Sequence, residues 1–280
     1  MANDGGTRYV RGMRVVSLGF RTDLAIRRLG GSTIKIRDEF VVVRTPANPG
    51  FWWGNFILLA RPVARDSGQA LRDAFEEEFP GADHMALGVD GTEGETGDQS
   101  TIDALGLSVE IDAVLTAERL REPRRTASDA VCRPLCGDGD WTQALTLRRA
   151  CDDRAETPQH RDFQERALAQ ARDICARGHG SWFGAFIGGR LVSSLGLIRT
   201  DSTTARYQTV ETHPDYRRQG LAGRLIYESG RYGVDELGAG RLVIVADPDY
   251  HAIDLYNRLG FTIVEQQAQL ALAAQPDSSA

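Results

Sequence analysis

The sequence is short of the features that mark several protein classes. It contains only four cysteines in 280 residues. Cys132 and Cys136 lie four positions apart, but no second cysteine pair or histidine pair completes a zinc pattern. No apolar run is long enough to cross a bilayer, and the first eight residues have no signal-peptide core. These shortages predict a cytoplasmic protein with free thiols and no metal site.

The sequence also has no excess of basic residues. The formal net charge is −6, with 33 basic and 39 acidic residues. Nucleic acids and anionic membranes select for a basic face, so neither is expected as a partner. All the basic residues except Lys35 are arginine, which we interpret as the codon usage of a GC-rich genome.

The chain is long enough for two domains of about 140 residues each. A polar stretch from Arg119 to Asp129 has no apolar periodicity and is interpreted as a linker. The predicted organisation is a first α/β domain over 1–120, a linker over 121–129, a second domain over 130–270 and a frayed tail over 271–280.

The second half predicts the element order α-α-β-β-β-α-β-α-β. The helices and strands are expected from apolar spacing and turn residues. Their predicted ranges are helices at 141–148 and 163–175, strands at 182–187, 191–198 and 206–212, a helix from 220, a strand at 242–246, a helix at 252–258 and a last strand from 261.

One turn in this half is suited to bind an anion. The strand that ends before Pro214 is followed by a helix whose first turn is Gly220-Leu221-Ala222-Gly223. Amides in a first helical turn have no intrahelical acceptors, and small residues let a diphosphate approach them. The alternative is an ordinary strand-to-helix turn in which the glycines only relieve crowding.

Two motifs in this half resemble those of the GNAT acetyltransferase family. Arg217-Arg218-Gln219-Gly220-Leu221-Ala222 is similar to the family's pyrophosphate signature, and Ala252-Ile253-Asp254-Leu255-Tyr256-Asn257-Arg258-Leu259-Gly260-Phe261 is similar to its late Leu-Tyr…Leu-Gly-Phe motif. The resemblance covers about residues 130–268. It implies an α/β acyl-CoA N-acyltransferase fold, a twisted mixed sheet whose central strands splay apart, with acetyl-CoA as acyl donor and no metal.

The resemblance also implies a set of contacts to coenzyme A. The pantetheine arm would bind along the opened strand edge, and the diphosphate at the helix start, with Arg217 or Arg218 pairing to a phosphate. The implied pantetheine contacts are Val210, Glu211 and Thr212, and the implied diphosphate contacts are Arg218, Gln219, Gly220, Leu221, Ala222 and Gly223.

Direct attack of an amine on the thioester needs a base, an oxyanion donor and an acid for the leaving thiolate. The resemblance implies that Tyr256 protonates the sulfur; the alternative is a core aromatic. An amide near Thr212 is the expected oxyanion donor. The base is open, because Arg206 stands where many members have glutamate and Asp249 replaces a frequent asparagine; the candidates are Glu211, His251 and a water chain.

The first half is interpreted as a degenerate copy of the second, or else as an unrelated α/β domain. Strands are expected at 39–44, 52–60, 85–89 and 108–115, with a helix at 68–79. The run from Arg65 to Ala70 has the signature spacing but contains Asp66, and an acidic turn follows it. This half is therefore expected to bind no coenzyme A. Trp52 and Trp53 are predicted to pack in the core.

These observations predict an acetyl-CoA-dependent N-acetyltransferase that modifies a primary amine of unknown identity. The expected partner is a small-molecule or peptide amine, with a homodimer left open. Two rival functions are a non-catalytic CoA-binding regulatory or scaffolding protein and the transfer of a different acyl group.

Overall fold

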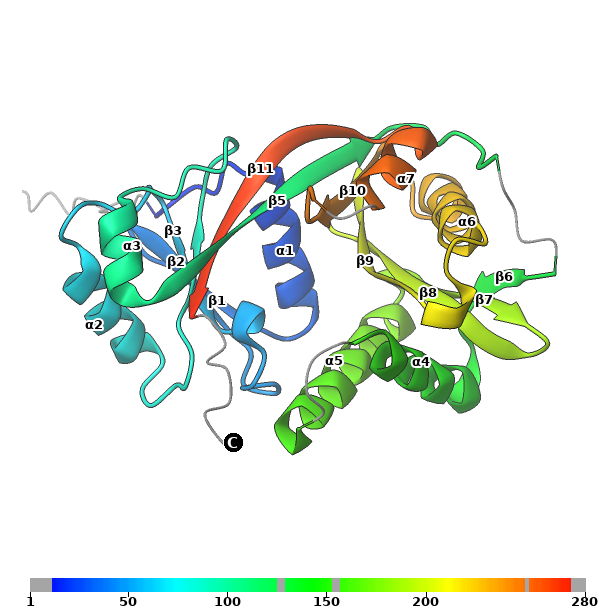
Figure 1. Cartoon of the computed structure of the whole chain (residues 1–280), viewed down its shortest axis with the longest axis horizontal. Coiled ribbons are helices and arrows are strands. Elements are labelled where there is room, and N and C mark those ends of the chain that lie inside the picture. Colours follow the sequence, from blue (N-terminus) through cyan, green and yellow to red (C-terminus); the bar gives the residue numbers. More distant parts are fainter. Residues whose placement is uncertain (1–11, 125–128, 153–156, 250–251, 273–280) are drawn as a thin grey trace, which may run out of the picture.

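One mixed sheet of eleven strands runs through the whole chain. The computed structural model describes residues 12–124, 129–152, 157–249 and 252–272 (Figure 1). The strand order across the sheet is β1-β2-β3-β4-β11-β5-β10-β9-β8-β7-β6. The predicted mixed α/β fold is therefore confirmed, with the two halves joined in a common sheet.

The first half contains three helices and five strands between the described residues 12 and 124. In chain order they are α1 (Leu18–Leu29), β1 (Thr33–Ile36), β2 (Phe40–Arg44), the 3-10 turn η1 (Trp52–Gly54), β3 (Phe56–Leu59), α2 (Gly68–Glu78), β4 (Ala86–Val89), α3 (Gln99–Leu105) and β5 (Leu107–Ala117).

The second half repeats this order after an additional strand and an additional helix at its start. Its elements are β6 (Val131–Pro134), α4 (Gly137–Cys151), α5 (Pro158–Ala176), β7 (Gly180–Ile187), β8 (Arg190–Arg199), β9 (Thr204–Thr212), η2 (Pro214–Tyr216), α6 (Leu221–Asp235), β10 (Arg241–Ala246), α7 (Ala252–Leu259) and β11 (Thr262–Leu272).

The two halves exchange their last strands. β5, from the first half, pairs with β10 of the second half, where Ala117 faces Leu242. β11, from the second half, pairs with β4 of the first half, where Ala268 faces Val89. β5 and β11 also pair with each other along most of their length. Figure 1 shows both strands crossing from one half to the other. The predicted linker separates the halves in sequence, but hydrogen bonds join them.

The exchange is stabilised because the segment 113–115 of β5 is apolar and buried on both faces. Val114 packs with Leu18 of α1 and Val243 of β10 on one face of the sheet. Leu115 points to the opposite face, into the largest core cluster, which also contains Ile244. Alternating side chains of a strand point to opposite faces. Burial of this segment against α1 on one face and against the largest core cluster on the other therefore stabilises the association of the two halves.

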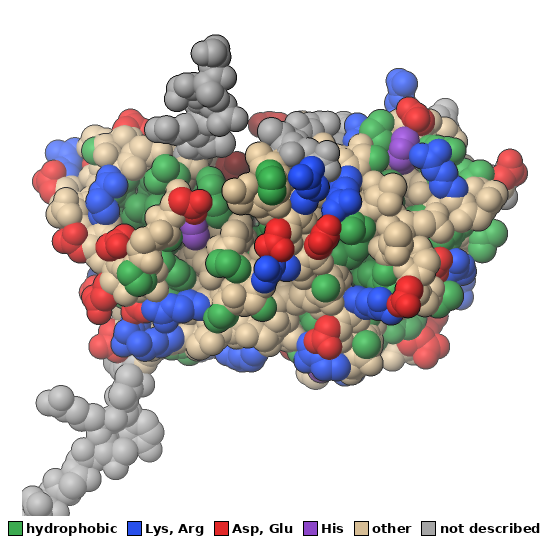
Figure 2. Space-filling view, turned by 90° about the horizontal axis from the view of Figure 1, so that it is seen from below, with side chains coloured by type: hydrophobic (Ala, Val, Ile, Leu, Met, Phe, Trp, Pro, Cys, Tyr) green, Lys and Arg blue, Asp and Glu red, His purple; other side chains and the backbone are tan. Residues whose placement is uncertain are grey.

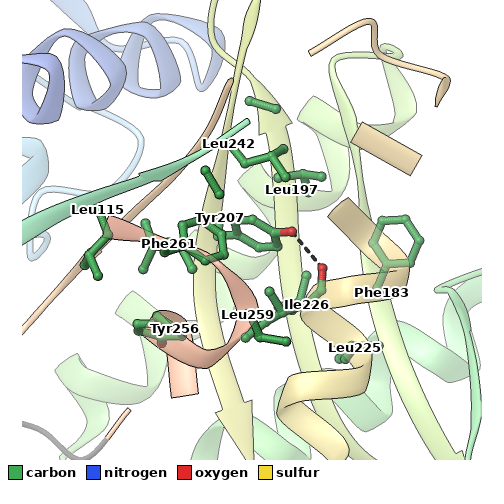
Figure 3. Close-up of a cluster of buried hydrophobic side chains, with 14 of the residues drawn as sticks. Leu115, Phe183, Leu197, Tyr207, Leu225, Ile226, Leu242, Tyr256, Leu259 and Phe261 are labelled. Atoms are coloured by element: carbon green, nitrogen blue, oxygen red, sulfur yellow. Dashed lines mark hydrogen bonds between the residues drawn. The ribbon is translucent and has the colours of Figure 1, made fainter. Parts of the chain in front are cut away.

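Helices cover both faces of the second half of the sheet. α6 and α7 cover one face, and α4 and α5 cover the other (Figure 1). Figure 3 shows the core beneath α6 and α7, where the Tyr207 hydroxyl donates to the Ile226 carbonyl at 2.7 Å. On the opposite face, Trp141 of α4 packs against Trp182 of β7.

The structure corrects one predicted strand and adds elements that the sequence pattern did not reveal. The strand expected over 52–60 begins only at Phe56, because Trp52–Gly54 forms a 3-10 turn. Asn55 holds this turn by accepting from the Thr45 amide at 2.9 Å and donating to the Phe51 carbonyl at 2.9 Å. Trp52 stacks on His84, and Trp53 meets Phe56 edge to face, so both indoles pack as expected.

The elements not predicted are α1, β1, α3 and β6. Among the helices in the described part of the chain, none combines the length and apolar character that a membrane crossing requires.

Candidate active site

The central strands β9 and β10 separate halfway along their length. Their parallel pairing covers only three positions, from Thr204 opposite Arg241 to Arg206 opposite Val243. β9 then continues to Thr212 while β10 stays paired to β5. The edge of β9 facing β10 is therefore open from Tyr207 onward. An open strand edge presents amides and carbonyls that an extended ligand can pair with.

A bulge on β9 marks the point where it leaves β10. The register between β8 and β9 shifts between Ser194 and Gly196, so that Ser194 faces Glu211 and Gly196 faces Gln208. Thr209 in the bulge has φ of 49°, which is strained for a β-branched residue. Such strain concentrates at functional sites, and here it changes the direction of the last residues of β9.

The start of α6 forms an anion cradle beside this opening. Gly220 is the N-cap, with φ of 84° and no side-chain capping bond. The first intrahelical bond runs from the Arg224 amide to the Gly220 carbonyl at 3.1 Å. The amides of Leu221, Ala222 and Gly223 therefore precede the helical ladder and are available to a diphosphate. The open edge and this helix start thus present two adjacent sets of unpaired backbone groups.

The two arginines of the loop before α6 have different surroundings. The Arg217 Nε donates to the Thr212 carbonyl at 3.2 Å, so this side chain folds back on β9. Arg218 is exposed and has φ of 62°. Gln219 donates to the Asp215 carbonyl at 3.4 Å, which closes the loop. Of the two arginines, Arg218 is the better placed to contact a phosphate.

Glu211 lies in a half-buried ion pair on the opposite face of the sheet from α6. Its Oε1 lies 3.3 Å from the Nε of Arg148 on α4, and the two side chains are 14% and 12% exposed. Its Oε2 is buried and has no hydrogen-bond partner in the described part of the chain. Burial raises the pKa of Glu211 above its ordinary value, and the charge of Arg148 opposes that rise. A carboxylate in this state is a suitable proton acceptor.

Tyr256 lies on α7, in the core cluster shown in Figure 3. Its side chain is 5% exposed, and its ring meets Phe261 edge to face at 6.2 Å. α7 follows β10, which is the second strand of the splayed pair. The position is thus compatible with both interpretations, a general acid at the opening and a core aromatic.

Arg206 and Asp249, the two residues that depart from the family pattern, lie in different surroundings. Arg206, which replaces the family's glutamate, is buried and pairs with Asp23 of α1 at 2.9 Å, so it links the two halves. Asp249 is exposed and its amide bonds to Asp247. His251 lies outside the described residues.

Two adjoining cavities open between the halves, on the face of the sheet away from α6. The larger is about 420 Å³ and is lined by α1, α4, α5 and β9, including Glu211. The smaller is about 290 Å³ and contains Asp23, Asp112 and Arg206. Both share the wall formed by Arg27, Phe51, Gln208 and Thr209. The bulge of β9 therefore lies in the wall of a cavity of small-molecule size.

Seen from below, the molecule exposes acidic and basic side chains that are interspersed over the visible surface (Figure 2).

Inside the smaller cavity, Asp112 of β5 is half-buried, and burial raises its pKa to about 6, with the negative charges of Glu110 and Asp23 adding to the rise. Considering only side chains that the structure describes, no group of three histidine, cysteine or carboxylate residues could hold a metal ion.

The sequence motifs did not reveal the residues that other elements bring to these cavities. Arg27 comes from α1, Phe51 from the loop before η1, Asp112 from β5 and Arg148 from α4. Arg148 was visible only as one position on an amphipathic helix, and no local motif marks the other three.

The corresponding strands of the first half do not separate. β3 and β4 stay paired from Ile57–Leu87 to the last residues, Leu59 and Val89, and the Asp90 amide then donates to the Leu59 carbonyl at 2.9 Å. At the start of α2, the amide of Asp66 bonds to the Thr101 hydroxyl. This half thus lacks the open edge that the second half provides.

Comparison with known proteins agrees with this geometry. Residues 144–261 match the model of the acetyltransferase (GNAT) family. No curated protein matches the chain.

Solved structures resemble the chain over most of its length. A conserved protein of unknown function from Staphylococcus epidermidis is 13% identical, with a TM-score of 0.67, over 94% of this chain and 95% of that one. A GCN5-related N-acetyltransferase from Kribbella flavida is 14% identical, with a TM-score of 0.63, over 92% and 97%. A tandem GNAT protein from the clavulanic acid biosynthesis pathway is 12% identical, with a TM-score of 0.52, over 88% and 86%. At these identities the likeness concerns the fold.

Proposed function

Because the second half of this chain belongs to the GNAT acetyltransferase family, we propose that the protein moves the acetyl group of acetyl-CoA to a primary amine bound between the two halves. The observation that carries this proposal is the separation of β9 from β10 after Arg206, with the α6 cradle beside it and a cavity on the opposite face. Acetyl-CoA on one side of β9 and the amine on the other would thus meet where β9 separates from β10.

The proposed donor contacts follow from this opening. Val210, Glu211 and Thr212 would pair their backbone with the pantetheine arm. The run from Arg218 to Gly223 would hold the diphosphate, with Arg217 keeping the loop against β9. Bound acetyl-CoA supplies the thioester carbonyl that the amine attacks, and an amide near Thr212 would donate to the oxygen that gains charge.

Two side chains would move the protons. Glu211 Oε2 would take a proton from the acceptor ammonium, which leaves a neutral amine able to attack. Tyr256 would give its hydroxyl proton to sulfur as the carbon–sulfur bond breaks. As the amide forms, the nitrogen loses a second proton, which would restore the Tyr256 hydroxyl. The products would then be the amide, the free thiol and one proton held by Glu211, so the reaction balances.

The transfer itself is tested by thiol release. Acetyl-CoA is mixed with the protein and a panel of primary amines, and we expect release that depends on the amine. Tight CoA binding without amine-dependent release across the panel would favour a regulatory CoA-binding protein. Faster release from propionyl-CoA or succinyl-CoA would favour transfer of another acyl group.

Replacing Gly220 with valine should weaken CoA binding by more than about tenfold, or ~1.4 kcal/mol. A β-branched side chain disfavours the φ of 84° at this N-cap and lies beside the first-turn amides. Calorimetry should show one CoA per chain for the wild type, because the first half lacks an open edge.

Gly238→Val is the matched control, since Gly238 has φ of 68° and is exposed beyond the other end of α6. It carries similar backbone strain and should keep wild-type CoA affinity. Unchanged binding in the Gly220 variant would mean that the site is misplaced, and two CoA per chain would assign a second site to the first half.

A further inference from the structure

Arg27, which forms no ion pair within the described residues, lies in the wall between the two cavities. The Arg27 guanidinium stacks on the Phe51 ring, with 4.3 Å from Cζ to the ring centroid. Its Nε is buried and has no hydrogen-bond partner in the described structure. Burial lowers the pKa of Arg27 to about 10, so the side chain is still charged at neutral pH. A desolvated charge without a partner is costly, and a bound anion would remove that cost.

The other arginines of the cavities are already paired. Arg148 contacts Glu211, and Arg206 contacts Asp23. The remaining Oδ2 of Asp23 accepts from Gln267 at 3.0 Å. Within the described residues, Arg27 is therefore the cavity arginine with no ion pair of its own, although Asp23 lies one turn before it on α1.

α1 holds Arg27 in a fixed position. At its start, Glu265 of β11 accepts from the Leu18 amide at 2.7 Å. At its end, Gln170 of α5 donates to the Gly30 carbonyl, and Arg177, which follows α5, donates to the Leu29 carbonyl. A helix tied at both ends keeps its side chains at constant positions, so the guanidinium is preorganised to bind a ligand.

The guanidinium faces the acceptor cavity and not the cofactor cradle. On β9, Tyr207 points to α6, where its hydroxyl bonds to the Ile226 carbonyl. The neighbouring Arg206 points to the opposite face and bonds to the Gly19 carbonyl of α1 at 2.9 Å. Arg27 lies on that second face, in the same cavity as Glu211. It is thus separated by the sheet from the amides that would hold the diphosphate.

We propose that Arg27 binds an anionic group of the acceptor, so that the amine substrate is a small molecule carrying a carboxylate or a phosphate. This proposal rests on the transferase function above. Arg27 would hold the anion at one wall while Glu211 receives the proton of the amine at another.

The rest of the cavity suits the part of the substrate between these groups. Ile26, Phe163, Ala167 and Trp182 line it with apolar surface, and Phe163 lies 5.4 Å from Phe51, ring centroid to ring centroid. An apolar spacer between an amine and an anion fits a cavity of about 420 Å³, which is of small-molecule size.

The test compares acceptors with and without the anion. The panel contains the common amino acids and the ω-amino acids from glycine to 6-aminohexanoate, each beside its carboxamide, and phosphoethanolamine beside ethanolamine. We expect the wild type to favour one anionic class by at least about tenfold in kcat/KM, as a charge-assisted hydrogen bond predicts. Comparing the carboxylate and phosphate pairs identifies which anion is used.

Arg27→Met keeps an unbranched side chain over Phe51 and removes the charge. It should reduce the preference to about one, by lowering kcat/KM for the anionic acceptors, and leave CoA affinity unchanged. Arg28→Met is the control, because Arg28 occupies the same helix end but is exposed. That variant should retain the preference.

Binding of the N-acetylated products, measured by calorimetry in the presence of CoA, gives a readout that needs no turnover. Turnover without anion preference, or a preference that survives in Arg27→Met, would overturn the anion site and leave the transferase intact. An Arg27-dependent preference in product binding without turnover of any amine would overturn the transferase and support the anion site. Neither binding preference nor turnover would overturn both.

Discussion

Replacing Tyr256 with phenylalanine is expected to lower kcat by about a hundredfold or more and to leave acetyl-CoA affinity nearly unchanged. The change removes only the hydroxyl, so the edge-to-face contact with Phe261 persists. A phenol hydroxyl can donate its proton to the departing thiolate as a general acid. Stopped-flow thiol release, with calorimetry for the donor, separates the two effects.

Tyr232→Phe provides the matched control. Tyr232 lies on α6 and also packs edge to face, on Phe183 at 5.2 Å, but far along the helix from the cradle. Its loss of a hydroxyl should leave kcat unchanged. If Tyr256→Phe retained wild-type kcat while chemistry limited the rate, Tyr256 would be a packing residue and the thiolate would leave without an acid.

Replacing Glu211 with glutamine is expected to lower kcat/KM by about a hundredfold or more and to remove the acidic limb of its pH profile. Burial raises the pKa of Glu211, so the limb should lie above the ordinary glutamate value of 4.5. As pH falls through this pKa the carboxylate is protonated and can no longer accept a proton, so activity falls. The amide cannot accept the proton at any pH.

The partner of Glu211 allows an independent test of the same assignment. Arg148→Met removes the positive charge that lowers the pKa of Glu211, so the acidic limb should move to higher pH. Glu165→Gln is the control, since Glu165 pairs with Arg149 of the same helix α4 but is 56% exposed. An acidic limb that persists in Glu211→Gln would assign the base to another group, including His251 or a water chain.

The parts predicted from sequence are those encoded by neighbouring residues. The helices of the second half followed from apolar spacing, and the cradle from Gly220 with the small residues after it. The 3-10 turn at Trp52–Gly54 was mistaken for a strand because aromatic residues favour strands. The strand starts only at Phe56 because Asn55 bonds to residues up to ten positions away, and local propensity does not contain such contacts.

The amino-acid sequence by itself determined that the second half carries a strand, a glycine-started helix and a late helix in GNAT order. Each of these depends on contacts within a few residues, so the local pattern is sufficient. Only the tertiary structure decided how the halves combine. Strand exchange depends on pairing between residues far apart, such as Ala117 with Leu242 and Val89 with Ala268. That exchange, with the Arg206–Asp23 pair, brings Arg27 to the cavity that Glu211 lines. Local patterns cannot predict this neighbourhood, because it depends on contacts between residues far apart in the sequence.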